Sequence, residues 1–215
     1  MAEQRGHGAL SPKYAEAVEH VAHLHRDQLR KGTNVPYLSH LMSVSALVLE
    51  DGGTELEAVA ALLHDAIEDV ADNALLAELK ERYGPEVVRI VEECSDDVAS
   101  ADGIKRPWVE RKTEYVEHVR QASDSALRIG VADKLHNLRC TVQDAREGTW
   151  PPFNACRHQQ VWYFDTLVRT YLDRLPASRM ARELDRVLDD LAEVLREARP
   201  AVRLPAPPPC ECAVG

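Results

Sequence analysis

The chain has 215 residues, of which 45% are hydrophobic and 29% are charged, and its formal net charge is −10. These values are ordinary for a globular protein of roughly one domain. The acidic balance argues against a polymeric nucleic acid as partner, because such binding relies on an extended cationic face. No apolar run approaches the roughly 20 residues that a membrane-spanning helix needs, so we expect no membrane association.

The two ends of the chain differ in composition from the rest. Residues 1–10 lack the apolar core of a secretory signal, and the five cysteines are odd in number, so we expect a cytoplasmic protein with reduced thiols. Residues 200–215 are rich in proline and alanine and are expected to form a flexible tail. The Cys-Glu-Cys group at residues 210–212 has no second half to complete a metal site. The predicted domain is therefore residues 11–199.

Apolar residues recur at spacings of three and four along most of the chain, which predicts an all-α fold of about eight to ten helices. Ser11 followed by Pro12 is a helix-start signal, and the apolar stripe of this helix extends through Leu29. A capping-box pattern, Thr54 with Glu57, opens a helix that leads into the most informative stretch of the chain. Further helices are predicted near residues 39–50, 74–83, 85–94, 108–121, 125–142, 154–174 and 178–198.

That stretch is residues 60–69, where an apolar run ends in His64-Asp65 and is followed one turn later by Glu68-Asp69. On a continuous helix, His64 lies above Glu68 and Asp65 above Asp69. Acidic residues in a last helical turn also oppose the helix macrodipole, which indicates another purpose for them. Carboxylates on a helix built for burial need partners, and a metal or a strong hydrogen-bond network would supply them.

His40, at the start of a helix, and Asp133, inside a later helix, complete a candidate metal-ligand set with His64 and Asp65. Imidazole with carboxylate suits Mn²⁺, Fe²⁺ or Zn²⁺, and the lack of thiolates argues against a structural zinc site. Each residue alone has an ordinary explanation, as a surface pair, a helix-start histidine or a solvated acid. A six-coordinate ion with four protein ligands would keep two positions for water and a phosphate oxygen.

Four sequence words carry a resemblance to a known family. They are His25-x-x-Gln28-x-Arg30-Lys31, Pro36-Tyr37-x-x-His40, Ala61-Leu62-Leu63-His64-Asp65-x-x-Glu68-Asp69 and Val131-Ala132-Asp133-Lys134-Leu135-x-Asn137-Leu138. In this order they resemble the HD-domain metal-dependent phosphohydrolases, and within these the hydrolase domain of the RelA/SpoT alarmone enzymes. The length of the chain is similar to that of the free-standing small alarmone hydrolases.

The resemblance implies an HD-domain helical bundle that uses Mn²⁺ to remove the 3′-pyrophosphate of ppGpp or pppGpp. The products would be GDP or GTP and pyrophosphate. The implied metal ligands are His40, His64, Asp65 and Asp133. Glu68 and Asp69 correspond to the catalytic pair, one acting on the attacking water and the other assisting it or protonating the leaving group. The sequence does not decide which carboxylate has which role.

Basic and polar side chains near these words are the candidate contacts to a small nucleotide substrate. They are Arg30, Lys31, Lys134 and Asn137. Arg30 and Lys31 are predicted to end the first helix, where the macrodipole alone would favour cations. The aromatic pair Trp162-Tyr163 would either line a binding site for a purine base or belong to the hydrophobic core.

Two positions depart from the family words, because Leu41 stands where members usually have proline and Gly130 where many have a basic residue. Two alternative functions therefore stay open. One is an HD-fold phosphatase that acts on another nucleotide, such as the 2′-phosphate of NADPH or a nucleoside monophosphate. The other is a non-catalytic sensor that binds a nucleotide or a metal. A homo-oligomer is compatible with either function.

Overall fold

All regular structure in the described part of the chain is helical, apart from one isolated antiparallel bridge between Leu29 and Pro36. The computed structural model describes residues 9–69, 73–95, 106–148, 156–202 and 206–207. The predicted all-α class is therefore confirmed. No helix in these ranges is both long and apolar enough to cross a membrane. Contacts divide the chain into two compact units, Met1–Ser95 and Asp96–Gly215.

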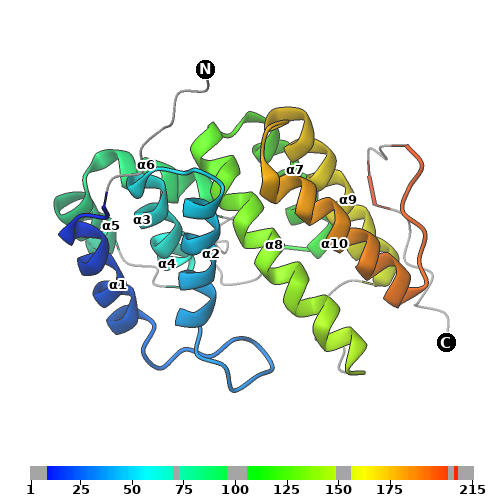
Figure 1. The fold of residues 1–215 in the computed structure, drawn as a ribbon, viewed down its shortest axis with the longest axis horizontal. Coiled ribbons are helices and arrows are strands. Elements are labelled where there is room, and N and C mark those ends of the chain that lie inside the picture. Colours follow the sequence, from blue (N-terminus) through cyan, green and yellow to red (C-terminus); the bar gives the residue numbers. More distant parts are fainter. Residues whose placement is uncertain (1–8, 70–72, 96–105, 149–155, 203–205, 208–215) are drawn as a thin grey trace. The chain divides into compact units, whose positions relative to one another are not determined.

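The first unit is arranged around a short apolar helix, α3. Its described helices are α1 Pro12–Leu24, α2 Leu38–Glu50, α3 Glu55–Leu63, α4 Ala66–Asp69, α5 Asn73–Tyr83 and α6 Pro85–Cys94. Helices α1, α2 and α6 all pack against α3 (Figure 1). Every residue of α3 from Glu57 to Leu63 is buried. The end of α3 is thus held firmly by its neighbours.

The predicted helix starts are confirmed by their caps. The hydroxyl of Ser11 accepts a hydrogen bond from the Lys13 N–H at 3.2 Å, as a helix N-cap does. Thr54 accepts from the Glu57 N–H at 3.2 Å, and the Glu57 carboxylate accepts from the Thr54 N–H at 2.7 Å. This reciprocal pair is the predicted capping box.

The first helix is shorter than predicted. It ends at Leu24, and Leu29 is half exposed instead of lying on the buried stripe. The chain forms a loop here because backbone bonds between its two sides replace helical ones. The Arg30 N–H donates to the Val35 carbonyl at 2.9 Å, and the Tyr37 N–H donates to the Gln28 carbonyl at 2.9 Å. The prediction that Arg30 and Lys31 end this helix is wrong.

The third predicted helix is interrupted. Helix α3 ends at Leu63, His64 and Asp65 form a turn, and α4 begins at Ala66. The imidazole of His64 contacts the Ala61 carbonyl, three residues back, at 2.8 Å. The side chain thus competes with backbone N–H groups for a carbonyl at the end of the helix. The expected continuous helix through His64 and Asp65 is therefore wrong. The expected stacking of His64 over Glu68 and of Asp65 over Asp69 stays a prediction, because the side chains of Glu68 and Asp69 lie outside the described part of the chain.

Four longer helices form the second unit. They are α7 Trp108–Gln121, α8 Asp124–Arg146, α9 Arg157–Arg174 and α10 Arg179–Leu195. Helix α10 packs along α8 and also contacts α9, and α7 packs on α9 (Figure 1). The buried side chains of α10 recur at spacings of three and four, which gives it a single apolar face.

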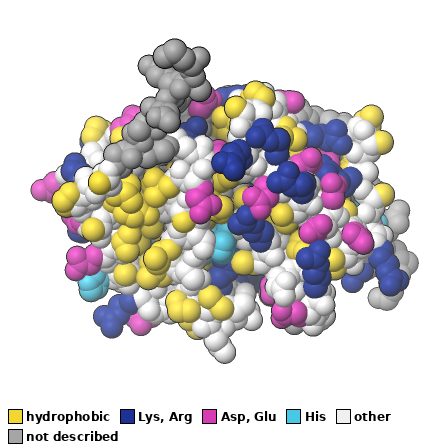
Figure 2. All heavy atoms as spheres, viewed as in Figure 1, with side chains coloured by type: hydrophobic (Ala, Val, Ile, Leu, Met, Phe, Trp, Pro, Cys, Tyr) yellow, Lys and Arg dark blue, Asp and Glu magenta, His cyan; other side chains and the backbone are white. Residues whose placement is uncertain are grey.

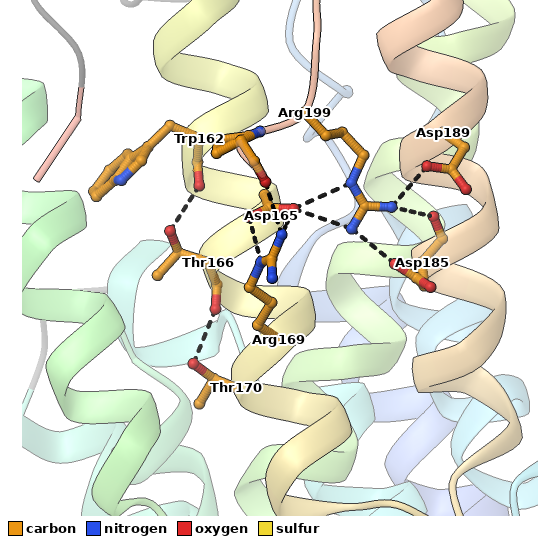
Figure 3. Close-up of polar contacts among 9 residues, drawn as sticks. Trp162, Asp165, Thr166, Arg169, Thr170, Asp185, Asp189 and Arg199 are labelled. Carbon is orange, nitrogen blue, oxygen red and sulfur yellow. Dashed lines mark hydrogen bonds and ion pairs between the residues drawn. The ribbon is translucent and has the colours of Figure 1, made fainter. Parts of the chain in front are cut away.

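A buried carboxylate joins the segment after α10 to the helices of the second unit (Figure 3). Asp165, only 1% exposed, accepts from Arg169 Nε at 2.7 Å and from Arg199 Nε at 3.1 Å. Arg199 also donates to Asp185 at 2.8 Å and to Asp189 at 2.7 Å. Burial lowers the pKa of Arg199, but its carboxylate partners outweigh this effect and raise the pKa above its ordinary value.

Charges of both signs are mixed over α8 and α10 on the face shown in Figure 2. Arg146 pairs with Asp190 at 3.1 Å, and Arg139 pairs with Glu183, so each exposed pair joins these two helices. The mixture leaves no extended cationic surface over these helices on this face. The predicted tail over 200–215 falls mainly outside the described residues, and the domain limits 11–199 stay a prediction.

Candidate metal centre

Three of the predicted ligands converge in the first unit. His40 lies in the first turn of α2, His64 caps α3, and Asp65 follows in the turn. Each offers a ligand atom, and these atoms all lie within 4.8 Å of one another. Both histidines are buried, at 1% and 4% exposure, while Asp65 is half-buried. The two imidazole rings are in edge contact, with centroids 5.4 Å apart.

The orientation of the His64 ring follows from its contact with the backbone. Nδ1 lies 2.8 Å from the carbonyl oxygen of Ala61. A carbonyl can only accept a hydrogen bond, so Nδ1 carries the hydrogen and Nε2 of the neutral ring carries the lone pair. This backbone contact is the arrangement that fixes the tautomer of metal-binding histidines.

The lone pair of His64 faces a carboxylate. Nε2 of His64 lies 3.2 Å from Oδ2 of Asp65, and Nε2 of His40 lies 3.8 Å from the same oxygen. Two acceptors at such a distance repel each other unless a cation or a proton lies between them. Donor atoms that share an ion at about 2.1 Å each lie about 3.0 to 3.4 Å apart in ordinary coordination geometries. The distance from His64 to Asp65 lies in this range, and the distance from His40 to Asp65 is about 0.4 Å longer than its upper end. The three residues therefore fit a divalent cation by donor type, and a small shift of His40 would bring it to coordination spacing.

The fourth predicted ligand, Asp133, lies on α8 in the second unit and is buried. Both of its carboxylate oxygens accept hydrogen bonds, from Lys134 Nζ at 2.6 Å and from Asn137 Nδ2 at 2.6 Å. Burial lowers the pKa of Lys134, but the charge of Asp133 together with the neighbouring tyrosines Tyr115, Tyr163 and Tyr171 outweighs burial and raises the pKa well above its ordinary value. Lys134 is thus a cation at neutral pH. That Asp133 shares an ion with the other three residues stays a prediction.

Comparison with known proteins identifies the family. Residues 17–151 match the family model described as the HD domain. The chain belongs to the HD domain family. It is 36% identical over 135 residues to guanosine-3′,5′-bis(diphosphate) 3′-pyrophosphohydrolase MESH1 of Mus musculus, with 61% of this chain and 71% of the relative covered. The Homo sapiens protein of the same name is 36% identical over 144 residues, covering 66% of this chain and 76% of the relative.

A solved structure shows the same relationship. The structure described as a metazoan ortholog of SpoT that hydrolyzes ppGpp matches with a TM-score of 0.66 at 27% identity. The match covers 83% of this chain and 95% of that one. The predicted resemblance to free-standing HD-domain hydrolases is therefore confirmed, and the chain is an HD-domain phosphohydrolase.

The predicted catalytic pair of this HD domain lies in α4, whose backbone is described through Asp69. The side chains of Glu68 and Asp69 lie outside the described part of the chain. Their roles stay predictions. Because α4 begins directly after Asp65, both residues follow Asp65 within four positions.

The predicted substrate contacts occupy two different settings. Arg30 and Lys31 lie in the loop between α1 and α2, where Lys31 is exposed and Arg30 is half-buried. Lys134 and Asn137 both donate to Asp133, and a contact from either to a substrate stays a prediction. Lys134 Nζ also lies 4.9 Å from the ring centroid of Tyr115, a cation–π contact that the sequence reasoning missed.

Trp162 and Tyr163 are buried within the second unit, at 2% and 4% exposure. The ring of Tyr163 contacts the rings of Trp108, Tyr115 and Phe164. Of the two predicted interpretations for this pair, the position agrees with membership of the aromatic core.

The two departures from the family words have packing explanations. Leu41 is fully buried on α2 and belongs to the core of the first unit. Gly130 on α8 lies so close to Tyr171 that a Cβ atom there would be 2.9 Å from the tyrosine oxygen. A longer side chain at position 130 would therefore need Tyr171 to move, although Tyr171 is fully buried on α9.

One residue beside the metal centre was not singled out for a role from the sequence. The hydroxyl of Tyr37 donates a hydrogen bond to Oδ2 of Asp65. Tyr37 stands three residues before His40 at the start of α2, a spacing that places two side chains on one helical face. That spacing was the available signal.

Proposed function

We propose that this protein is a Mn²⁺-dependent hydrolase that removes the 3′-pyrophosphate of guanosine tetra- or pentaphosphate. The reaction adds water to the 3′ phosphorus and breaks the bond from that phosphorus to the ribose 3′ oxygen. The products are GDP or GTP and pyrophosphate. The names of the relatives support this substrate, since several are guanosine-3′,5′-bis(diphosphate) 3′-pyrophosphohydrolases.

The observation that carries the proposal is the convergence of His40, His64 and Asp65. Their ligand atoms lie within 4.8 Å of one another, and the His64 tautomer directs a lone pair toward Asp65. A bound divalent cation acts as a Lewis acid on a phosphoryl oxygen and lowers the pKa of water, which is the chemistry that phosphoanhydride and phosphoester hydrolysis needs. Asp133 is proposed as the fourth ligand.

The remaining roles are proposed for residues of the same sequence words. Glu68 orients the attacking water or accepts its proton, and Asp69 assists it or protonates the leaving oxygen. Arg30 and Lys31 offset the charge of the phosphates. Because the net charge of the chain is −10, an anionic nucleotide depends on such local cations for binding.

The test is an assay of pyrophosphate release from ppGpp by purified protein with Mn²⁺. We expect turnover by the wild type and by Asp27→Asn, a control that changes an exposed aspartate of the first unit. We expect strong loss of turnover in Asp65→Asn and in Glu68→Gln, because each variant keeps the size of the side chain and removes its charge.

The same assay separates the alternatives. Release of phosphate from NADPH without turnover of ppGpp would replace the proposed substrate and keep the phosphohydrolase. Binding of a guanine nucleotide without turnover of any substrate would identify a sensor and contradict the proposed activity.

A further inference from the structure

The candidate metal ligand Asp65 is held by a tyrosine that belongs to no predicted ligand or substrate set. The hydroxyl of Tyr37 donates a hydrogen bond to Oδ2 of Asp65. This oxygen is also the one that faces Nε2 of His64 at 3.2 Å and Nε2 of His40 at 3.8 Å. The tyrosine therefore acts on the atom at which the three ligands converge.

The ring of Tyr37 is fixed between two histidines. Its centroid lies 5.7 Å from that of His25 and 5.4 Å from that of His40. The His40 ring in turn contacts that of His64. The four rings thus form a row, in which His40 and His64 are predicted ligands and the other two support them.

The backbone of Tyr37 is fixed as well. Its N–H donates to the carbonyl of Gln28 at 2.9 Å, and its own carbonyl accepts from the His40 N–H at 2.9 Å. The side-chain oxygen of Gln28 lies 2.5 Å from Nδ1 of His25, and the His25 ring contacts the ring of Tyr37. His25 is buried, at 2% exposure. Gln28 therefore contacts both the backbone of Tyr37 and the imidazole of His25.

We propose that Tyr37 is a positioning residue for the metal centre, which orients the Asp65 carboxylate and raises the affinity for the divalent cation. The inference rests on the proposed function, because it requires that His40, His64 and Asp65 bind a metal. A carboxylate oxygen has two lone-pair directions, so Oδ2 can accept from Tyr37 and still bind an ion. Hydrogen-bond partners of metal ligands typically contribute about 10- to 100-fold in metal affinity.

The experiment is a calorimetric titration of metal-free protein with Mn²⁺, in the wild type, Tyr37→Phe and Tyr14→Phe. Both variants remove one phenolic oxygen from the first unit. Tyr14 is the matched control, since its hydroxyl contacts Ser45 Oγ at 2.9 Å and takes no part in the metal centre. We expect Tyr37→Phe to weaken Mn²⁺ binding by about 10- to 100-fold and Tyr14→Phe to leave it unchanged.

A second readout separates positioning from general damage to the fold. The melting temperatures of the two metal-free variants should be alike, and saturating Mn²⁺ should restore most of the turnover of Tyr37→Phe. Equal Mn²⁺ affinity in the wild type and Tyr37→Phe would overturn the inference. An absence of Mn²⁺ binding by the wild type would overturn the metal centre and the inference together. Metal binding that depends on Tyr37, without turnover of ppGpp, would support the inference and contradict the proposed substrate.

Discussion

Nε2 of His64 lies 3.2 Å from Oδ2 of Asp65, while Nδ1 of the same ring contacts the Ala61 carbonyl at 2.8 Å. The backbone contact places the lone pair of the neutral ring on the side of the carboxylate. Two acceptors held together in this way are stabilised by a cation between them. The structure at the end of α3 therefore favours the binding of a cation. This and other features of the structure lead to effects that can be measured.

The first consequence concerns metal removal. Treating the protein with a chelator should lower its melting temperature, and Mn²⁺ should restore it, because a ligand that binds the folded state stabilises it. The gain is about 2.7 kcal/mol when the free ion is at 100 times its dissociation constant. Thermal melts of His64→Ala should show no such gain, whereas His23→Ala, which changes an exposed histidine of α1, should respond as the wild type does. A full response in His64→Ala would exclude this residue as a ligand.

The second concerns the close approach of α8 and α9 at Gly130. Glycine to alanine in a helix normally stabilises by about 1 kcal/mol. Here the new Cβ would lie 2.9 Å from the Tyr171 oxygen, so Gly130→Ala should instead destabilise by about 1–3 kcal/mol. Adding Tyr171→Phe removes the clashing atom, and the double variant should recover stability relative to Gly130→Ala. Denaturant unfolding of the two single variants and the double variant measures the coupling. Additive effects would contradict this account.

The third concerns the network at Asp165. Arg199→Ala removes one of the two guanidinium partners of a carboxylate that is 1% exposed, and should cost about 1–3 kcal/mol of unfolding free energy. Arg146→Ala is the matched control, because it breaks an exposed pair between α8 and α10 and should stay within about 0.5 kcal/mol. Urea unfolding measures the free energy of unfolding of both variants. Equal losses in the two would show that the Asp165 network contributes no more stability than an exposed ion pair.

The fourth concerns pH. Burial is the largest effect on His20, which contacts Tyr83 at 3.0 Å and lies beside Glu78 and Arg82, and it lowers the pKa of His20 below 6.5. The unfolded chain then binds more protons between the lowered pKa and 6.5, so stability is full above this window and falls as the pH drops through it.

The fall in stability should therefore be smaller in His20→Gln than in the wild type when unfolding is compared at about pH 7.5 and about pH 5.5. His23→Gln, at an exposed position on the same helix, should behave as the wild type. Identical pH dependence in all three proteins would show that His20 titrates normally in the folded state.

Local signals predicted much of the fold. The sequence predicted the capping box of Thr54 with Glu57 and the cap at Ser11, because the hydrogen bonds of each cap join residues at most three positions apart. The sequence did not predict the early end of α1. That end depends on backbone hydrogen bonds between Gln28 and Tyr37 and between Arg30 and Val35, and only the folded loop brings these residues together. The helix period continued past Leu24, and tertiary structure overrode it.

The site was predicted in part, for a similar reason. His40, His64 and Asp65 were found from residue types and order, and the structure brings them together. The support from Tyr37 was missed because it connects residues 28 positions apart through a side-chain contact. The contact between Arg199 and Asp165 is of the same long-range kind. The sequence shows only that Tyr37 shares a helical face with His40, and it carries no signal for the long-range contacts of Tyr37 with Asp65 or of Arg199 with Asp165.

The most direct test of the metal centre is an anomalous difference map from crystals grown with Mn²⁺. We predict a single strong peak within coordination distance of His40 Nε2, His64 Nε2 and Asp65 Oδ2, with Asp133 as the fourth protein ligand. No peak beside His40, His64 and Asp65, or a peak held by other residues, would contradict the account.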